Sequence, residues 1–514
     1  MSKTIIIIGA GLAGLSAALQ AAENGCNVKL VSSFPSERAQ SVMAEGGINA
    51  ALNTKDENDS PEEHFTDTIK AACGLADPNA VWGMTQAAPE LVHWLLKLGV
   101  QFNMSGYDDV DLRNFGGQKK KRTAFAQSDT GKQIMTAMID AVRRKEASGM
   151  VERFSHHSFL TLRLCGNICC GCVIRDEYSQ ETVELPGDAV IVAAGGMHGL
   201  FGNTTGSLSN TGAVTAELFR LGVPLANGEM IQYHPTTVKC GGKRMLISEA
   251  ARGEGGRLFA MKDGKQWYFM EEKYPELGNL MPRDITAREI WKVSHESEVF
   301  LDMTEISEEI ISNKLSGLAD DCMTYLHKDI RKEPVAVLPG IHYFMGGILV
   351  DEQHRTPIQN LCAAGECCAQ YHGANRLGGN SLLGALYGGR VAAKSACEQA
   401  DVVDLSCATQ IDFPPASQIS EIKQLNKVMQ ETMGVVRNEN TLLNGIQTVQ
   451  ALTGNLPLLG MAVLKSALAR KESRGAHWRE DYPKSNDDDY LKTTVARFDG
   501  KQIQISFVPV PERR

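Results

Sequence analysis

Residues 3–33 read KTIIIIGAGLAGLSAALQAAENGCNVKLVSS and predict a strand, a glycine-rich turn, a helix and a second strand. The apolar run over residues 5–8 is uninterrupted, as in parallel strands that are buried on both faces. Gly9, Gly11 and Gly14 follow with the Gly-x-Gly-x-x-Gly spacing that places the pyrophosphate of a dinucleotide at a helix N-terminus. The stretch therefore predicts an α/β fold with a dinucleotide site near its start.

The residue that should contact the adenosine ribose departs from the usual pattern. An acidic side chain normally ends the second strand of this unit, whereas Ser32 and Ser33 stand there, so a hydroxyl would have to replace the carboxylate. Residues 4–22 follow Lys3 and are rich in apolar and small residues, as in a signal peptide. The three ordered glycines favour the nucleotide-binding interpretation.

Composition restricts the function classes. A chain of 514 residues is long enough for about two to four domains, and 43% hydrophobic with 22% charged residues is typical of globular proteins. The 52 Lys and Arg against 61 Asp and Glu give a formal charge of −9, which disfavours nucleic acid and anionic membrane as partners. No apolar run reaches the roughly 18 residues of a transmembrane helix.

The thirteen cysteines are an odd number at irregular spacing, which we interpret as reduced thiols of a cytosolic or anaerobic protein. One dense cluster contains Cys165, Cys169, Cys170 and Cys172, within residues 161–176, which alternate as in a β-hairpin. The separated Cys-x-x-Cys pairs of zinc and iron–sulfur sites are missing. We therefore predict that these cysteines act as small hydrophobic residues and that the chain holds no metal.

Other segments predict the organisation of the remaining chain. Residues 188–196, DAVIVAAGG, predict another buried strand that ends in a glycine pair, and residues 380–400 predict a helix. The basic run KKKR at 119–122 predicts a solvated loop. The sequence DFPPAS at 412–417 marks a linker, after which residues 421–471 have helical periodicity.

Ten motifs occur in one order along the chain. They are GAGLAG (9–14), MAEGGINAAL (43–52), FGGQKKKRTAFAQSDTG (115–131), VAAGG (192–196), QYHPTT (232–237), ISEAARGEGGRL (247–258), PRD (282–284), HYFMGG (342–347), AAGE with HGANRLGGNSL (363–382) and ARKESRGAHWREDYP (469–483). Together they resemble the flavoprotein subunit of the fumarate reductase and succinate dehydrogenase family, which also contains L-aspartate oxidase.

The resemblance implies an α/β, Rossmann-like FAD-binding domain with an inserted α+β capping domain and a C-terminal helical domain. We expect the FAD-binding domain over residues 1–231 and 346–411, the capping domain over 232–345, and the helical domain with a tail over 418–514. It also implies an oxidoreductase that acts on the CH–CH bond of a dicarboxylate, with FAD as cofactor.

Reducing a double bond between two carboxylates needs a hydride from a cofactor, a proton donor and groups that bind both carboxylates. By the resemblance, His234, His342 and Arg376 bind the carboxylates, together with the hydroxyl of Ser248, where the family usually has Thr. Arg283 would donate the proton. Arginine is a weak acid with a pKa above about 12, so a relay must replace the proton, and Glu249 and Arg252 match the family's relay positions.

The resemblance also assigns residues to FAD. The pyrophosphate would lie at the turn formed by Gly9, Ala10, Gly11, Leu12, Ala13 and Gly14, and the ribose would lie near Ser32. The flavin ring would lie beside a loop with Ser41, Glu45, Gly46 and Gly47 and beside a second turn with Ala194 and Gly195. Glu366 would bind the ribitol, and Ser381 and Leu382 match the later flavin contacts. Asp67 also matches a flavin position.

Two departures from the family pattern bear on the activity. Gln40 stands where membrane-bound relatives attach the flavin to a His, which predicts non-covalent FAD and favours reduction of an enoate over oxidation of succinate. Phe115 replaces the acidic residue that L-aspartate oxidase places for the substrate ammonium, which favours a simple dicarboxylate. The run LISEAARGEGG leans toward L-aspartate oxidase, so that alternative stays open beside a succinate dehydrogenase subunit.

The electron source must lie outside this chain, because it has neither a haem-binding Cys-x-x-Cys-His nor a ferredoxin-like cysteine spacing. We expect an iron–sulfur partner subunit or a diffusible donor. The alternative from a different functional class is a subunit that relays electrons within a complex and is not the catalyst. The expected location is the cytoplasm. If partner subunits are present, they would hold the protein at the inner face of the membrane.

Overall fold

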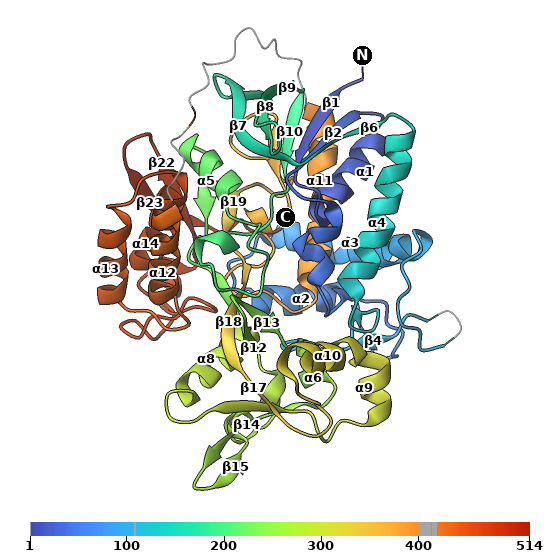
Figure 1. Ribbon diagram of the computed structural model, residues 1–514, viewed down its shortest axis with the longest axis vertical. Coiled ribbons are helices and arrows are strands. Elements are labelled where there is room, and N and C mark those ends of the chain that lie inside the picture. Colours follow the sequence, from blue (N-terminus) through green and yellow to red (C-terminus); the bar gives the residue numbers. More distant parts are fainter. Residues whose placement is uncertain (1, 107–108, 400–412, 414–418) are drawn as a thin grey trace.

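The computed structural model describes residues 2–106, 109–399, 413 and 419–514. Its first sheet has the strand order β20-β10-β1-β2-β6, and every neighbouring pair is parallel (Figure 1). Its strands are β1 (Thr4–Ile8), β2 (Asn27–Ser32), β6 (Val151–Ser155), β10 (Ala189–Val192) and β20 (Leu361–Ala363). Because β20 belongs to the second half of the sequence, the chain leaves this sheet and later returns to it.

The apolar run of β1 is explained by cover on both faces of the sheet. Ile5 and Ile7 belong to the core formed with α1 (Leu12–Glu23), α4 (Thr130–Ala147) and α11 (Asn380–Gln399). Ile6 and Ile8 belong to a second apolar cluster on the opposite face. Helix α11 packs along α1 (Figure 1), and a Cβ at Gly389 would lie 2.3 Å from the Ala13 carbonyl oxygen.

The opposite face is covered by the cysteine-rich hairpin. Strands β7 (His157–Cys165) and β8 (Ile168–Asp176) pair as predicted, and β9 (Thr182–Pro186) joins them. Cys169 and Cys172 lie in the same apolar cluster as Ile6, which confirms their hydrophobic role. Cys165 is bonded in a disulfide, so the prediction of reduced thiols is wrong for this residue. It ends β7, and its side chain is half-buried.

The middle of the chain forms a body with its own core below the first sheet (Figure 1). One sheet has the order β13-β12-β18 and another has the order β15-β14-β16-β17. These strands are β12 (Ile231–Cys240), β13 (Lys243–Leu246), β14 (Arg257–Lys262), β15 (Lys265–Trp267), β16 (Val299–Asp302), β17 (Val335–Ala336) and β18 (Leu338–Phe344). The helices of this body are α6 (Glu249–Gly253), α7 (Phe269–Lys273), α8 (Arg283–Val293), α9 (Glu308–Lys314) and α10 (Ser316–Asp321).

The C-terminal part begins with the helices predicted from periodicity, α12 (Ile419–Thr432), α13 (Glu439–Val449) and α14 (Asn455–Ala469). A short helix, α15 (Asp487–Tyr490), and a hairpin that the sequence did not indicate follow them. Its strands β22 (Lys492–Phe498) and β23 (Ile503–Pro509) extend a sheet of order β21-β19-β11-β22-β23. The other members are β11 (Leu225–Ala226), β19 (Gly347–Leu349) and β21 (Cys368–Ala369). Helix α5 (Ala213–Arg220) precedes β11 in the chain. The predicted linker lies outside the described residues except at 413.

The basic run differs from its prediction at one position. Lys119 and Lys121 are exposed, as expected of a solvated loop. Arg122 is fully buried, and its Nη2 lies 2.9 Å from Asp59 Oδ1 and 3.0 Å from Asp67 Oδ2. The basic run alone could not predict these ion pairs, because Asp59 and Asp67 are distant from Arg122 in sequence. Asp67 belongs to α2 (Pro61–Ala71), which is followed by α3 (Pro78–Lys97).

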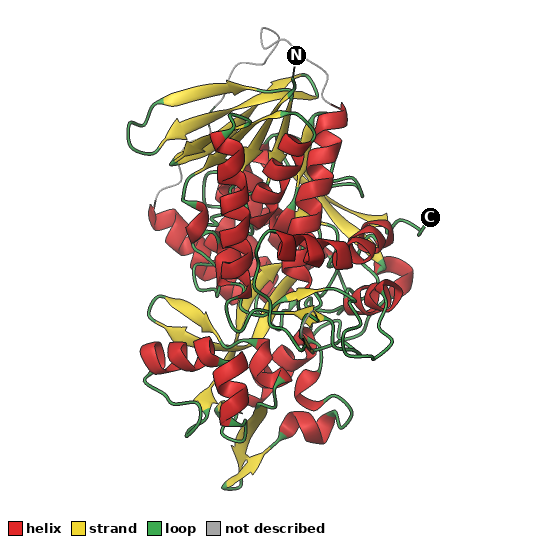
Figure 2. Ribbon diagram, turned by 90° about the vertical axis from the view of Figure 1, so that its right-hand side faces the viewer, coloured by secondary structure: helices red, strands yellow, loops and turns green. Residues whose placement is uncertain are grey.

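Figure 2 shows the first sheet at one end of the elongated molecule and the middle body at the other, with a cluster of helices between them. Three very short strands, β3 (Ile48–Asn49), β4 (Leu112–Arg113) and β5 (Thr123–Ala124), form a sheet of order β3-β5-β4 that adjoins the site. Among the described residues, no helix is long and apolar enough to cross a membrane.

Candidate active site

A cavity of about 1050 Å³ runs from the carboxyl ends of the first sheet to the middle body. Carboxyl ends of parallel strands are where such sheets bind ligands, because loops and helix N-termini meet there. Almost every residue that the sequence assigned to cofactor or substrate lines this cavity; Gly14 and Arg252 lie behind its wall, and Asp67 pairs with Arg122 instead. One continuous space therefore collects residues from both halves of the chain.

The end of the cavity near α1 fits the pyrophosphate of a dinucleotide. Gly9 has a φ of +111°, and a Cβ there would lie 2.2 Å from the Ala193 carbonyl oxygen. A Cβ on Gly14 would lie 1.8 Å from the Gly9 carbonyl oxygen, so α1 can pack on β1 only with glycine there. Gly11 is the N-cap residue of α1 and offers no side chain, which leaves the helix N-terminus open to an anion.

Ser32 ends β2 beside this turn, where the ribose was expected. Its Oγ is buried and has no hydrogen-bond partner among the described residues. A buried hydroxyl without a partner costs free energy, which a ligand hydroxyl would recover. The residues present therefore fit an adenosine ribose, with a hydroxyl in place of the usual acid.

The next part of the cavity is lined from two sides. One side comprises Ser41, Glu45, Gly46 and Gly47, and the other comprises Ala194, Gly195, Glu366, Ser381 and Leu382. Ser41 Oγ accepts a hydrogen bond from the Leu12 N–H at 3.3 Å, and Glu366 Oε1 accepts one from the Phe344 N–H at 3.1 Å. The backbone thus holds both side chains in place.

Glu45 carries an unusual charge state. Burial, followed by the charge of Asp321, raises the pKa of Glu45 to about 8, although Arg113 acts against this shift. Its Oε2 is buried and has no hydrogen-bond partner among the described residues. The side chain is therefore mostly protonated at neutral pH and presents a neutral carboxyl group to the cavity.

Gln40 lines the cavity beside Ser41, and its Oε1 accepts a hydrogen bond from the Ser207 N–H at 2.6 Å. The carboxamide is thereby tied to the loop that carries Ser207. An amide has no nucleophile comparable to an imidazole, so this position offers a hydrogen bond and no covalent link.

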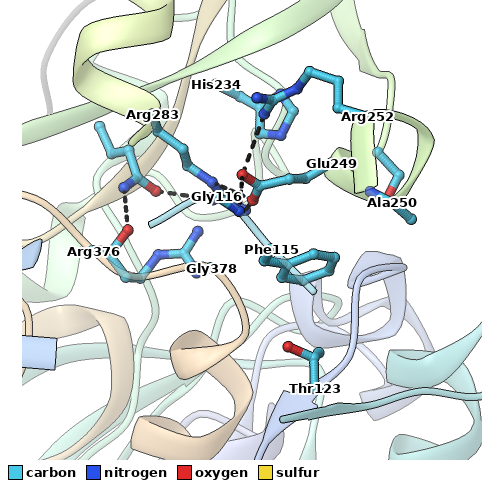
Figure 3. A network of polar contacts seen from close by, with 12 residues as sticks. Phe115, Gly116, Thr123, His234, Glu249, Ala250, Arg252, Arg283, Arg376 and Gly378 are labelled. Atoms are coloured by element: carbon cyan, nitrogen blue, oxygen red, sulfur yellow. Dashed lines mark hydrogen bonds and ion pairs between the residues drawn. The ribbon is translucent and has the colours of Figure 1, made fainter. Parts of the chain in front are cut away.

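At the far end, Arg283 and Arg252 share the carboxylate of Glu249 (Figure 3). Arg283 donates to Glu249 Oε2 from Nε at 2.9 Å and from Nη2 at 2.5 Å, and Arg252 Nη2 lies 3.3 Å from Oε1. Oε1 also accepts from the Gly116 N–H at 3.1 Å. Burial acts to raise the pKa of Glu249, but the two arginines outweigh it and lower the pKa, so the carboxyl is ionised.

His234 and His342 stand beside this network with ring centroids 5.1 Å apart. Burial, followed by the positive charge of Arg283, lowers the pKa of both histidines well below its usual range. Both imidazoles are therefore neutral at pH 7. Each can donate one hydrogen bond, and their neutrality avoids a further cation beside Arg283.

Arg376 approaches the site from the loop before α11. Its Cζ lies 4.4 Å from the centroid of the Tyr343 ring, and its buried Nε has no hydrogen-bond partner among the described residues. Burial, followed by the charge of Arg283, lowers the pKa of Arg376 to about 9, so the group remains cationic at neutral pH. A planar guanidinium with free donors in a buried cavity is suited to a carboxylate.

Phe115 and Ser248 complete the walls. Phe115 is 1% exposed, and a Cβ on Gly46 or on Gly378 would approach its ring to 2.9 Å, so the ring fills the space between these two glycines. Figure 3 places it below Glu249, facing the network. Ser248 is the N-cap of α6 and its Oγ accepts from the Ala250 N–H at 3.4 Å.

Gln232 and Tyr343 were not assigned from the sequence, although both lie within the quoted motifs. Gln232 Oε1 accepts from Arg283 Nη1 at 3.0 Å, and its Nε2 donates to the Arg376 carbonyl oxygen at 2.8 Å. It therefore connects the two arginines. Alternation along β12 places it on the same side as His234, two residues away, and this spacing could have indicated it.

A model of the FAD binding domain matches residues 4–382, and a model described as fumarate reductase flavoprotein C-term matches residues 452–513. The succinate dehydrogenase flavoprotein subunit of Bacillus subtilis is 38% identical over 100% of this chain and 98% of its own length. The chain belongs to the succinate dehydrogenase and fumarate reductase flavoprotein family. This flavoprotein is thus an FAD-dependent oxidoreductase of that type, as the motif order predicted.

Other relatives of this flavoprotein are named as fumarate reductases. The 8-methylmenaquinol:fumarate reductase flavoprotein subunit of Wolinella succinogenes is 32% identical over 100% of this chain and 92% of its own length. The solved E. coli quinol fumarate reductase FrdA has 28% identity and a TM-score of 0.90, with 99% of this chain and 97% of that chain covered. The fold is therefore that of these flavoproteins, while the direction of the reaction is left open.

Proposed function

We propose that this flavoprotein reduces fumarate, or a closely related enoate, to the saturated dicarboxylate. The observation that carries the proposal is the position of Arg283, fixed by Glu249 and Gln232 at the cavity wall between the carboxylate-binding candidates. Bound FAD supplies the hydride chemistry that no side chain can provide. The cavity residues described above fit its pyrophosphate, ribose and ring.

The substrate carboxylates would be bound by Arg376 from one side and by neutral His234 and His342 from the other. These groups are fixed in a buried site, so they stabilise developing negative charge without reorganising. An Nη atom of Arg283 donates the proton to the substrate carbon. Glu249 and Arg252 then form a hydrogen-bonded route along which a proton taken up from solvent would return to Arg283.

FAD would be bound without a covalent link to the protein. Gln40, which faces the flavin part of the cavity and bonds to the Ser207 N–H, supports this proposal. Loss of an alkyl link lowers the oxidising power of a flavin, which favours reduction of the enoate over oxidation of succinate. A succinate dehydrogenase is therefore the alternative in which the same residues act in reverse.

L-Aspartate oxidase is the second alternative, and Phe115 disfavours it. An amino acid substrate brings an ammonium group that needs a carboxylate or carbonyl partner. Phe115 offers none, and Glu249 already accepts from Arg283, Arg252 and the Gly116 N–H. A simple dicarboxylate leaves no such group unpaired.

An iron–sulfur subunit is the proposed electron partner, with a diffusible donor as the alternative. Relatives are named as flavoprotein subunits, which describes them as parts of larger enzymes. Such a partner would deliver electrons to the bound flavin, and it would also hold this protein at the inner face of the membrane.

The test measures three reactions of the purified, FAD-loaded chain under the same conditions. These are fumarate reduction with reduced viologen, succinate oxidation with an artificial electron acceptor, and L-aspartate oxidation with oxygen. We expect fumarate reduction to be the fastest. Aspartate turnover equal to or above fumarate turnover would establish the oxidase, faster succinate oxidation would establish the dehydrogenase direction, and no turnover of any substrate would favour a pure relay of electrons.

A further inference from the structure

A short loop over residues 204–207 lies directly behind His342. The loop is held at both ends, because the Thr204 carbonyl oxygen accepts from the Arg244 N–H at 3.1 Å and the Ser207 N–H donates to Gln40 Oε1 at 2.6 Å. Between them, the Thr205 N–H donates to the Ile341 carbonyl oxygen at 3.0 Å. The loop is therefore fixed against β18 one residue before His342.

The Thr205 hydroxyl forms a hydrogen bond with His342. Its Oγ1 lies 2.8 Å from His342 Nδ1, whereas the Ile341 carbonyl oxygen lies at 3.4 Å and already accepts from the Thr205 N–H. The shorter contact is the stronger hydrogen bond. Thr205 does not line the cavity, so its hydroxyl acts on the ligand only through the imidazole.

A neutral imidazole has a single N–H, and its location decides what the ring can bind. When the Thr205 hydroxyl donates to Nδ1, the ring proton sits on Nε2, which can then donate to a carboxylate in the cavity. In the other tautomer Nδ1 donates to Thr205 and Nε2 presents a lone pair, which repels a carboxylate. The hydrogen bond of the Thr205 hydroxyl therefore determines whether His342 binds or repels a carboxylate.

We propose that Thr205 is a positioning residue that holds His342 as the Nε2–H tautomer, oriented to donate to a substrate carboxylate. The proposal rests on the proposed dicarboxylate function and adds a residue outside the cavity to it. In the described ranges no hydroxyl lies as close to His234, since its Nδ1 lies 3.1 Å from the Thr236 carbonyl oxygen and 3.4 Å from Thr236 Oγ1. Thr205 thus acts on one of the two histidines.

The experiment uses FAD-loaded protein and follows the flavin absorbance change on titration with succinate. Thr205→Val keeps the shape and removes the hydroxyl, so we expect the succinate Kd to rise by about 5- to 10-fold, the effect of one lost hydrogen bond. Thr205→Ser keeps the hydroxyl, and we expect a Kd close to that of the wild type. The effect of Thr205→Val must also disappear when His342→Ala is already present.

Two outcomes would overturn the role of Thr205. One is wild-type affinity in Thr205→Val, and the other is an equal loss with and without His342→Ala, which would indicate a general disturbance of the loop. A wild-type protein that binds no succinate would instead count against the proposed function.

The tautomer can also be read without a Thr205 variant. In ¹⁵N spectra of FAD-loaded protein with labelled histidine, the His342 signal is identified by its loss in His342→Ala. We expect the chemical shifts of an Nε2–H imidazole. An Nδ1–H imidazole would overturn the proposal, whether or not Thr205→Val folds and whether or not succinate binds.

Discussion

Arg283 donates two hydrogen bonds to a single oxygen of Glu249, from Nε at 2.9 Å and from Nη2 at 2.5 Å, while Arg252 approaches the other oxygen. Two guanidinium groups thus share one buried carboxylate. Each buried charge depends on the others, because removing one partner leaves an uncompensated charge in a medium of low polarity. The arrangement fixes Arg283 in place, and within the described part of the chain its Nη1 is bonded only to a neutral amide, that of Gln232.

Replacing Arg283 by lysine should mainly affect catalysis. The ammonium of Arg283→Lys keeps a positive charge near Glu249 but has one nitrogen in place of the three by which Arg283 contacts Glu249 and Gln232, so the transferable proton is displaced. We expect kcat for fumarate reduction to fall by roughly 10²- to 10⁴-fold with little change in the succinate Kd. Steady-state kinetics and a binding titration measure the two quantities. Near-full activity in this variant would move the role of proton donor to another residue.

Arg376→Lys should show the opposite balance. Arg376 Nε has no hydrogen-bond partner in the part of the chain that the structure describes, and its guanidinium lies over Tyr343, so it can bind a carboxylate with two parallel hydrogen bonds, which an ammonium cannot do. We expect a weaker succinate Kd, by about tenfold or more, in addition to any loss in kcat. Unchanged succinate binding would show that the carboxylates are bound elsewhere. FAD affinity is the control and should not change in either variant.

The sequence predicted the strands and helices around the first sheet because their signals are local. Residues 5–8 are apolar on both faces, and the glycine turn needs only the spacing of Gly9, Gly11 and Gly14. The burial of Arg122 could not be read in this way, since Asp59 and Asp67 reach it only through the fold. The C-terminal hairpin was missed for the same reason, because β22 is stabilised by pairing with the distant β11.

In the site, the residue types were predicted through motifs, but their connections were not. The spacing of Gln232 from His234 could have placed Gln232 near the site, but neither composition nor spacing could have identified the bonding partners of Gln232 and Thr205. Gln232 bonds to Arg283 and to the Arg376 backbone, and Thr205 bonds to His342, each across many residues of sequence. The network that orients the site is therefore a property of the folded chain.

Gln40 predicts that FAD can be extracted. Precipitation of the holoprotein with acid should release all flavin into the supernatant, since the Gln40 amide offers only a hydrogen bond to its surroundings. The absorbance of the washed pellet and the mass of the unfolded chain measure any residual flavin. Gln40→Ala should release flavin equally. Yellow colour in the wild-type pellet, with a mass increase equal to FAD, would show a covalent link at another residue.

Glu45 predicts a pH dependence of stability. Its pKa is raised from 4.5 to about 8 by burial and by Asp321. The folded chain therefore binds a proton that the unfolded chain releases between these values. Its contribution to the free energy of unfolding is fully present below pH 4.5 and is lost as the pH rises through about 8.

Glu45→Gln keeps the shape and cannot ionise, so the apoprotein variant should lose less stability than the wild type between about pH 5 and pH 8. Urea unfolding midpoints at several pH values in this window measure the difference. Glu152→Gln, at an exposed position of β6, is the matched control and should follow the wild-type curve. Identical slopes for the wild type and Glu45→Gln would mean that Glu45 is already ionised in the folded protein, and that the cavity beside the flavin loop carries a negative charge at neutral pH.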